Sequence, residues 1–296
     1  MKHKSRKIKF IFFMFLVPAL ASHTLFIIFP FLKSLYYSFT NFDGMSRQYK
    51  FVGIGNYIDL FHDSAMLASM SYTLFYTFSS IVLVTLFAIP LAIILDSGMK
   101  TRNLQRAVFF FPSVPSSLAI GYIWAYIFSP TDSGALNYLL HNLFGMERVP
   151  WLSDPLLARV STVIVGVWAS LGWHAVLYVA NLQTIPHEYY EAAQIDGATW
   201  RQRLFHITIP MLSPAMTASL LILTTGGLKV FEIPFALTKG GPGFETHSIS
   251  QVIILRGISE MFYGKASAMS IVLFLFIAII TIIQLKWTQG REARLR

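Results

Sequence analysis

The segment Glu188-Tyr-Tyr-Glu191-Ala-Ala-Gln-Ile-Asp196-Gly197-Ala198, which continues to Pro210, decides how this chain is interpreted. It belongs to a polar stretch of about thirty residues, 184–213, that separates two long apolar runs. A simple connector between two membrane helices needs far fewer residues than this. We therefore expect the stretch to lie at a membrane surface as a preformed structure that docks onto a partner.

The same stretch predicts two short helices. The first begins at Thr184 or Ile185 with Pro186 in its first turn, where the missing N–H costs no hydrogen bond. Gly197 supplies its C-terminal turn, and Pro210 ends a second, amphipathic helix. An amphipathic helix can lie on lipid or dock onto a protein, and the residues alone leave both open. Its apolar side chains, which alternate with basic ones, are Trp200, Leu204, Phe205 and Ile207.

Composition places the chain in a membrane. Of its 296 residues, 55% are hydrophobic and only 12% are charged, and the mean hydropathy is +0.58, which excludes an ordinary soluble domain. The absence of cysteine removes thiol chemistry, disulfides and cysteine-based metal sites. The net charge of +9 does not predict nucleic-acid binding, because the basic residues stand at the ends of apolar runs, as membranes require.

Six apolar runs are long enough, or nearly so, to cross a bilayer core of about 30 Å as helices. They predict an all-α polytopic membrane protein with one transmembrane domain over 10–287, a basic N-terminus at 1–9 and a basic tail at 288–296. The predicted spans are 10–32, 72–95, 107–128, 156–181, 215–237 and 266–287.

Basic residues orient these spans. Fourteen of the 23 Lys and Arg residues are assigned to the side of both termini and of 184–213, whereas eight are assigned to the opposite side. Seven of these eight lie in 33–71, 129–155 and 239–265, and the eighth, Arg159, lies at the start of the fourth span. Because cytoplasmic segments retain positive charge, both termini and the polar stretch are predicted to be cytoplasmic. A cleavable signal peptide ending near Ala21 is the rival interpretation of the first run, but this run continues to Phe31 and is too long for one.

Four residues inside the apolar runs are candidates for a solute pathway. Lys229 and Glu232 are three residues apart in the fifth run, where an ionised group is costly unless it faces protein or water. They could form an i,i+3 pair that only stabilises the helix, or they could bind hydroxyl groups of a sugar. Trp168 and Trp173 could belong to an interfacial aromatic belt or stack against sugar rings. Both alternatives stay open.

No catalytic or metal-binding motif is present in the sequence. A GxxxxGK[S/T] phosphate loop is absent, since Gly264-Lys265 is followed by Ala266. A His-x-x-x-His pair and a nucleophile elbow are absent as well. We therefore expect a chain that is not an enzyme and holds neither cofactor nor metal, so that any nucleotide chemistry belongs to a partner.

The polar stretch resembles the EAA loop of permease subunits in binding-protein-dependent ABC importers. Its matching residues are Glu191-Ala-Ala-x-x-Asp196-Gly197-Ala, followed by Phe205, Ile207, Ile209 and Pro210. In that family the loop lies between transmembrane helices four and five and forms a coupling helix that fits a cleft on the ATP-hydrolysing subunit. The resemblance implies this coupling role for Glu188, Glu191, Ala192, Ala193, Asp196, Gly197 and Ala198.

The resemblance covers nearly the whole chain and points to the carbohydrate-uptake branch, of the maltose and glycerol-phosphate type. Lys239 departs from the family, where a small residue is common, and this affects only the shape of the outer loop. The similar segments are Phe51-Val-Gly-Ile-Gly-Asn56-Tyr57, Phe110-Phe-Pro112-Ser-Val-Pro115, Leu228-Lys-Val-Phe231-Glu232 and Leu237-Thr-Lys-Gly240-Gly-Pro242-Gly.

This branch implies a type I importer permease fold and a heterodimeric sugar importer in a bacterial cell membrane. The implied partners are a second, similar permease, two ATP-binding subunits that hold ATP and magnesium, and an extracytoplasmic solute-binding protein. The sugar is not predicted, because the binding protein normally sets specificity.

Two alternatives remain. Importers of polyamines, phosphate or amino acids belong to the same broad class, although segments 51–57 and 240–243 argue against them. An ion-coupled secondary carrier is the other, but such carriers use intramembrane carboxylates and often internal repeats, and the predicted spans offer Glu232 alone.

Overall fold

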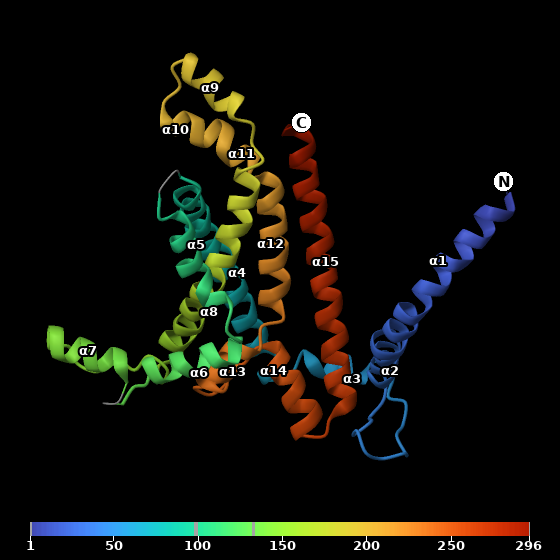
Figure 1. Ribbon diagram of the computed structural model, residues 1–296. Helices are drawn as coiled ribbons and strands as arrows, with labels where there is room; N and C mark the ends of the chain where they lie inside the picture. The colour runs from blue at the N-terminus through green and yellow to red at the C-terminus, as the bar shows by residue number, and fades with distance from the viewer. Residues whose placement is uncertain (1, 98–99, 132–133, 296) are drawn as a thin grey trace. The chain divides into compact units, whose positions relative to one another are not determined.

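The computed structural model describes residues 2–97, 100–131 and 134–295, which are helical apart from turns, loops and an isolated bridge between Thr40 and Phe51 (Figure 1). The predicted all-α class is confirmed. The chain divides into two compact units, Met1–Asp63 with Ile253–Leu275, and Ser64–Val252 with Phe276–Arg296. Arg296, one of the basic residues assigned to the cytoplasmic side, lies outside the described residues.

Four helical stretches are long and apolar enough to cross a membrane. They confirm the predicted spans 10–32, 72–95, 156–181 and 266–287, with shifted ends. These stretches are Phe13–Tyr37, formed by α1 (Lys2–His23), η1 (Thr24–Ile28) and α2 (Phe29–Tyr37); α4 (Ser64–Asp96); α8 (Pro155–Leu182); and Tyr263–Thr288, within α15 (Tyr263–Leu295).

The third predicted span, 107–128, is broken. The stretch of α5 (Arg102–Phe110) and η2 (Phe111–Ser113) meets α6 (Ser117–Ile127) at an angle of 89°. Pro112 and Pro115 weaken the helix here, because neither has an N–H to donate. The residue that leaves the helical conformation is Ser116, whose ψ is 143°. Ser116 then starts α6 afresh, since its side chain accepts a hydrogen bond from the amide of Ala119 at 3.2 Å.

The fifth predicted span, 215–237, is also divided. α12 (Ser213–Leu228) ends before residues 229–231, and α13 (Glu232–Thr238) follows them. The sequence Thr-Thr-Gly-Gly before Leu228 weakens the end of α12, because threonine and glycine are poor helix formers. The helical stretch Trp200–Met211 precedes α12 with a bend of 61°. If each bent pair is one span, the described residues provide up to six.

The centre of the larger unit is the packing of α4 against α8, with α12 beside α4. Glycines permit the close approach of α8 to its neighbours. A methyl group on Gly166 would collide with the hydroxyl of Tyr76, and one on Gly172 would collide with the backbone of Phe109. Small residues are typical of helix contacts in membranes, where van der Waals packing replaces the hydrophobic effect. These contacts position the walls of a cavity described below.

The smaller unit contains a loop after α2 that α3 (Gly55–Leu60) holds in place. The side-chain amide of Asn56 donates to the carbonyls of Ser38 and Thr40 at 2.9 and 2.7 Å. In the same unit the Arg256 guanidinium lies 2.8 Å from the Asp63 carboxylate and 2.5 Å from that of Glu260. Hydrogen bonds and ion pairs therefore hold the loops of this unit in place.

Besides α3, which lies within 33–71, two more helices of the described residues lie in segments that were expected only as connections. α7 (Ala135–Phe144) lies within 129–155. α14 (Ile249–Ile254), continued by η4 (Leu255–Ser259), lies within 239–265. Neither has the length needed to cross a bilayer. Apolar runs of spanning length therefore do not indicate these two helices.

Candidate functional site

The polar stretch 184–213 folds into two helices joined by a tight turn, as predicted. α9 (His187–Ile195) is followed by α10 (Trp200–Arg203), which continues through η3 (Leu204–Thr208) into α11 (Ile209–Met211). Figure 1 shows α9 and α10 projecting beyond the end of α8. α9 begins later than expected, because Pro186 is extended and precedes the helix as its N-cap. We call α9–α11 the coupling segment.

Gly197 closes α9 in a conformation that favours glycine. Its φ is +73°, in the left-handed region that a Cβ makes unfavourable. The amide of Gly197 donates to the carbonyl of Gln194 at 3.1 Å, and the amide of Ala198 donates to that of Ala193 at 2.8 Å. Together these bonds form a Schellman motif, which satisfies carbonyls left free at the helix end. The predicted C-terminal turn is confirmed.

Thr199 starts the second helix with a capping box. The amide of Gln202 donates to the Thr199 hydroxyl at 3.4 Å, and the Thr199 amide donates to the Gln202 side-chain oxygen at 2.7 Å. Two amides that a helix start leaves free are thereby satisfied reciprocally. The turn between α9 and α10 is therefore shaped on both sides by neighbouring residues of the sequence.

The coupling segment is attached to the spanning helices by its inner side. The hydroxyls of Tyr190 in α9 and Thr208 in η3 are 3.1 Å apart. Ile185, just before α9, is buried in the same core cluster as Leu182 of α8 and Leu212 before α12, and Tyr190 packs against this cluster. α9 is therefore in contact with the core that α8 shares with the start of α12.

The outer side of the coupling segment carries the predicted coupling residues. Two apolar side chains beside these residues are also exposed, Ile195 at 86% and Trp200 at 61%. A protein partner could cover such a combination of apolar side chains and carboxylates. The sequence did not indicate Ile195, since an isoleucine near a helix end is usually buried. Five predicted residues are exposed and two are half-buried: Glu188, Glu191, Ala192, Asp196 and Gly197, and Ala193 and Ala198 respectively.

A polar network joins the ends of α4, α5 and α8 at this same end of the larger unit. The Arg106 guanidinium donates to the carbonyl of Leu95 at 3.0 and 3.2 Å and lies 3.6 Å from the Asp96 carboxylate. The Gln183 amide also donates to Asp96, at 3.2 Å. These contacts satisfy the C-terminal end of α4 and hold three helix ends together below the coupling segment.

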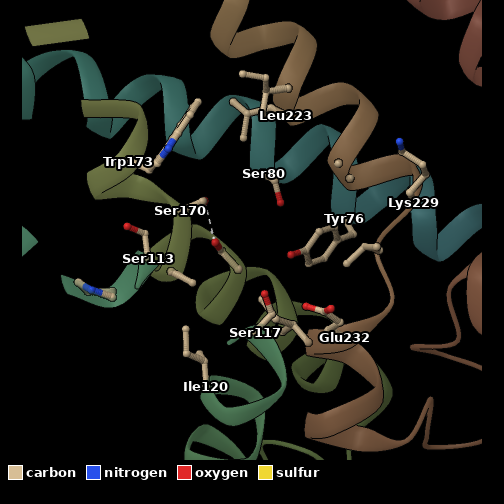
Figure 2. A pocket seen from close by; sticks show the side chains of 18 of the residues that line it. Tyr76, Ser80, Ser113, Ser117, Ile120, Ser170, Trp173, Leu223, Lys229 and Glu232 are labelled. Atoms are coloured by element: carbon tan, nitrogen blue, oxygen red, sulfur yellow. Dashed lines mark hydrogen bonds between the residues drawn. The ribbon is translucent and has the colours of Figure 1, made fainter. Parts of the chain in front are cut away.

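The second candidate site is a cavity of about 530 Å³ in the larger unit (Figure 2). Its walls come from α4, α8, the end of α12, the start of α13 and the break between α5 and α6. The volume suits a small molecule. Its polar and aromatic lining includes Tyr76, Ser80, Ser113, Ser117, Ser170, Trp173, His174, Lys229, Phe231 and Glu232.

Lys229 and Glu232 both line this cavity, and of their two alternatives the i,i+3 pair on one helix is not formed. Lys229 caps the end of α12 with φ −106°, whereas Glu232 begins α13, so no continuous helix places one above the other. Both residues are exposed, and no ion pair joins them within the described residues. Figure 2 shows their side chains directed to different sides of the cavity.

The two tryptophans occupy different places. Trp173 lines the cavity, whereas Trp168 is not among its lining residues and packs edge-on against Trp124, with ring centroids 5.3 Å apart. His174 is buried, and its Nδ1 lies 2.8 Å from the hydroxyl of Ser219, so the packing between helices holds it in place.

Hydroxyl groups of the cavity have hydrogen-bonding capacity left. Ser80 is 5% exposed, and its hydroxyl makes no hydrogen bond of normal geometry among the described residues, although it interacts with the Tyr76 side chain. Leaving such a group unsatisfied costs about 1–3 kcal/mol, so a ligand hydroxyl there would be favourable. The Ser113 and Ser170 hydroxyls donate to the carbonyls of Phe110 and Gly166 at 2.7 and 2.8 Å, and their oxygens can still accept. Three serines on separate elements form no motif, which is why the sequence did not indicate them.

No group of three or more His, Asp or Glu side chains that could hold a metal ion occurs in the part of the chain that the structure describes.

Known proteins resemble this chain over nearly its full length. Residues 85–287 match the family described as binding-protein-dependent transport system inner membrane component. The probable starch degradation products transport system permease protein AmyD of Thermoanaerobacterium thermosulfurigenes is 31% identical over 96% of this chain and 96% of that protein. The trehalose/maltose transport system permease protein MalF of Thermococcus litoralis is 33% identical over 93% of this chain and 92% of that protein.

A solved structure is similar in fold. A chain of a bacterial ABC transporter involved in the import of the acidic polysaccharide alginate matches with a TM-score of 0.86 at 23% identity, covering 97% of this chain and 98% of that chain. The predicted type I importer permease fold is confirmed.

Proposed function

Since this chain belongs to the family of binding-protein-dependent transport system inner membrane components, we propose that it is one of two permease subunits of an ATP-driven importer whose solute is a sugar. The coupling segment carries this proposal. It is a locally shaped helical turn with exposed carboxylates, attached by Ile185 and Tyr190 to the core of two spanning helices. Such a device suits the transfer of motion from a soluble motor.

We assign ATP hydrolysis to a partner. Two ATP-binding subunits would hold ATP and magnesium, and each would receive the coupling segment of one permease in a cleft. Ile195 and Trp200 would supply apolar contact, while Glu188, Glu191 and Asp196 would face basic groups of that cleft. Closure of the ATP-binding subunits would then move α9, and the core contacts would carry this motion to α8 and α12.

A second permease and a binding protein complete the proposed assembly. The second permease is a similar but distinct chain, and the translocation pathway runs between the two. The solute-binding protein delivers its sugar at the membrane face opposite the coupling segment, which is the extracytoplasmic face. The family description supports dependence on a binding protein.

The cavity supports a sugar as the solute. Hydroxyls of Tyr76 and of several serines can exchange hydrogen bonds with sugar hydroxyls, and the ring of Trp173 can stack against an apolar sugar face. Lys229 and Glu232 would add charged hydrogen bonds from two walls. We assign stacking to Trp173 and not to Trp168, whose ring packs against Trp124. Two relatives named for starch products and for trehalose and maltose support the same class.

The proposed orientation places both termini and the coupling segment in the cytoplasm. The chain has no cysteine, so a single introduced cysteine reports its own position. In intact cells a membrane-impermeant maleimide should not label Gln202→Cys, and it should label Asn142→Cys on α7. Labelling of Gln202→Cys in sealed cells would reverse the orientation, and permeabilised cells serve as the control for reactivity.

Transport itself is the decisive measurement. The two permeases and the ATP-binding subunits would be reconstituted in liposomes with ATP inside and the binding protein outside, and radiolabelled maltose, trehalose, phosphate, polyamines and amino acids would be compared. We expect uptake of a sugar that requires both ATP and the binding protein. Uptake of a non-sugar alone would overturn the substrate class, and uptake driven by an ion gradient without ATP would overturn the importer mechanism.

A further inference from the structure

α7 carries an apolar face that the protein covers only in part. Leu136, Leu139, Leu140 and Leu143 recur at the spacing i, i+3, i+4 and i+7, which places them on one side of a helix. His141 and Asn142 lie on the other side. The sequence of this helix contains no Asp, Glu, Lys or Arg. α7 is therefore amphipathic without being charged.

The direction of the leucine face follows from Leu136. This residue packs against a buried cluster that contains Phe128 and Val165. Val165 lies ten residues into α8, counted from Pro155, which is about 15 Å along the helix axis. The leucine face is thus turned toward the apolar cluster that packs between the spanning helices. Farther along the same face, Leu139 is 51% exposed and Leu143 is 70% exposed.

Asn137 holds α7 in this orientation. Its side-chain oxygen accepts from the amide of Val149 and from the indole N–H of Trp151, both at 3.1 Å, and its side-chain amide donates to the Val149 carbonyl at 3.0 Å. Asn137 itself is 3% exposed. These bonds tie α7 to the chain that leads into α8. The exposed leucines therefore belong to a helix that is held in place.

The position of α7 along the membrane is given by α8. α7 precedes the N-terminal end of this span, whereas the coupling segment follows its C-terminal end. Figure 1 shows α7 extending sideways from α6 and α8. Exposed apolar residues continue down α8 at Leu156, Val160 and Ile164, spaced to form one stripe that suits lipid tails.

We propose that α7 is an interfacial helix that lies in the lipid headgroup layer on the membrane face opposite the coupling segment. Leu139 and Leu143 reach the boundary with the acyl chains, while His141 and Asn142 face water. A helix of this kind gains binding free energy from the apolar area that it buries in the interface. Its continuity with the apolar stripe of α8 favours lipid over a protein partner as the covering medium.

Spin labels test this placement in the assembled transporter. Single cysteines at Leu139, Leu143, His141 and Asn142 would be labelled with a nitroxide, and the complex of permeases and ATP-binding subunits would be reconstituted in phosphatidylcholine and phosphatidylglycerol bilayers. Power saturation then compares collisions with oxygen, which concentrates in lipid, and with a water-soluble nickel chelate. We expect oxygen to dominate at Leu139→Cys and Leu143→Cys, and the nickel chelate to dominate at His141→Cys and Asn142→Cys.

Two results would overturn the proposal. Dominance of the nickel chelate at all four positions would show a helix in water. An immobilised label at positions 139 and 143 that neither reagent reaches would show that a protein, such as the second permease, covers this face. Leu156→Cys on α8 serves as the lipid-facing reference. Since all four replaced side chains are exposed, the variants should fold, and the yield of assembled complex checks this.

Discussion

The coupling segment and the cavity are built in opposite ways. The turn of the coupling segment is shaped by residues that are neighbours in the sequence, through the Schellman motif at Gly197 and the capping box at Thr199. The cavity is enclosed by distant elements and includes two helix breaks, after Ser113 and after Leu228. The difference suits their proposed roles. A docking element must keep its shape, whereas a pathway must open and close, and helix breaks are where backbone dihedral angles can change.

The largest effect should come from the turn of the coupling segment. Gly197→Leu would force a side chain with a Cβ into a left-handed conformation, at a cost of about 1–2 kcal/mol. The turn would relax to another shape and tilt α9 away from its docking position. We expect sugar uptake to be abolished and less ATP-binding subunit to be recovered on copurification, while the protein remains in the membrane.

Gly145→Leu is the matched control for this change. Gly145 also has a positive φ, +63°, and, like Gly197, it would place an added Cβ with no heavy atom within 4 Å. It ends α7, away from the coupling segment, so the same backbone strain should leave copurification intact. Normal uptake in Gly197→Leu would contradict the coupling role.

The charged residues of the cavity should give the next largest effect. Lys229→Met and Glu232→Gln should each reduce uptake about tenfold, which corresponds to about 1.4 kcal/mol, within the range for hydrogen bonds to charged groups. Because no ion pair joins them, the double variant should be reduced about a hundredfold, the product of the two. Complex yield should stay unchanged. Uptake and yield are measured for the three variants side by side.

Restored uptake in the double variant would instead indicate a purely structural pair. Lys239→Met and Glu147→Gln, which remove exposed charges outside the cavity, are the controls and should transport normally.

A smaller effect is expected from the helix contact behind the cavity. Gly172→Ala would place a methyl group against the carbonyl of Phe109, and backbone cannot move aside as a side chain can. We expect a loss of about 1–3 kcal/mol in stability, typical of overpacking, seen as a lower Tm and yield. Gly226→Ala is the control, since nothing lies within 4 Å of its added Cβ. A stable Gly172→Ala protein would show that the close contact of α8 with α5 does not define the cavity wall.

The smallest effect concerns a second locally formed turn, at residues 238–248. His247 donates from Nδ1 to the carbonyl of Gly240 at 2.8 Å, and burial lowers the pKa of His247 below its ordinary value of 6.5. Protonation therefore favours the unfolded state. Stability should be fully present above about pH 6.5 and decrease as the pH falls through the lowered value.

Thermal unfolding at about pH 7.5 and about pH 5.5, on either side of the ordinary histidine pKa, measures this effect. His247→Gln should show a smaller decrease in Tm than the natural chain. His62→Gln, which replaces an exposed histidine in the turn after α3, should retain the natural decrease. If His247→Gln also retains it, another group is responsible for the pH dependence.

Much of the fold could be predicted because it depends on composition and local patterns. Long apolar runs specify α4, α8 and α15, since a membrane requires about twenty apolar residues per span. The turn at Gly197 could be predicted because glycine after a helical run signals a left-handed turn. The break at Pro112 and Pro115 could be predicted from the sequence as well, because a proline disturbs the helix at the residues next to it.

The cavity could not be predicted in the same way. Lys229 and Glu232 have helical spacing, but the glycines before Leu228 end the helix before that spacing applies. Ser80, Ser113 and Ser170 come together only through the tertiary contacts of α4, η2 and α8. Ile195 is exposed because the chain turns immediately after it, whereas hydrophobicity alone favours burial. In each case, the outcome depends on contacts between distant residues.

The break after α12 has an electrostatic consequence for the cavity. The aligned peptide dipoles of a helix amount to about half an elementary charge at each end, negative at the C-terminus and positive at the N-terminus. Lys229 stands at the C-terminal end of α12, and Glu232 stands in the first turn of α13. The helix end beside each residue thus carries a partial charge of opposite sign to that of its side chain. Neither side chain therefore needs the other as a partner. In the proposed pathway, the linker 229–231 would give the cavity a cation and an anion that are free to exchange their hydrogen bonds with a passing solute.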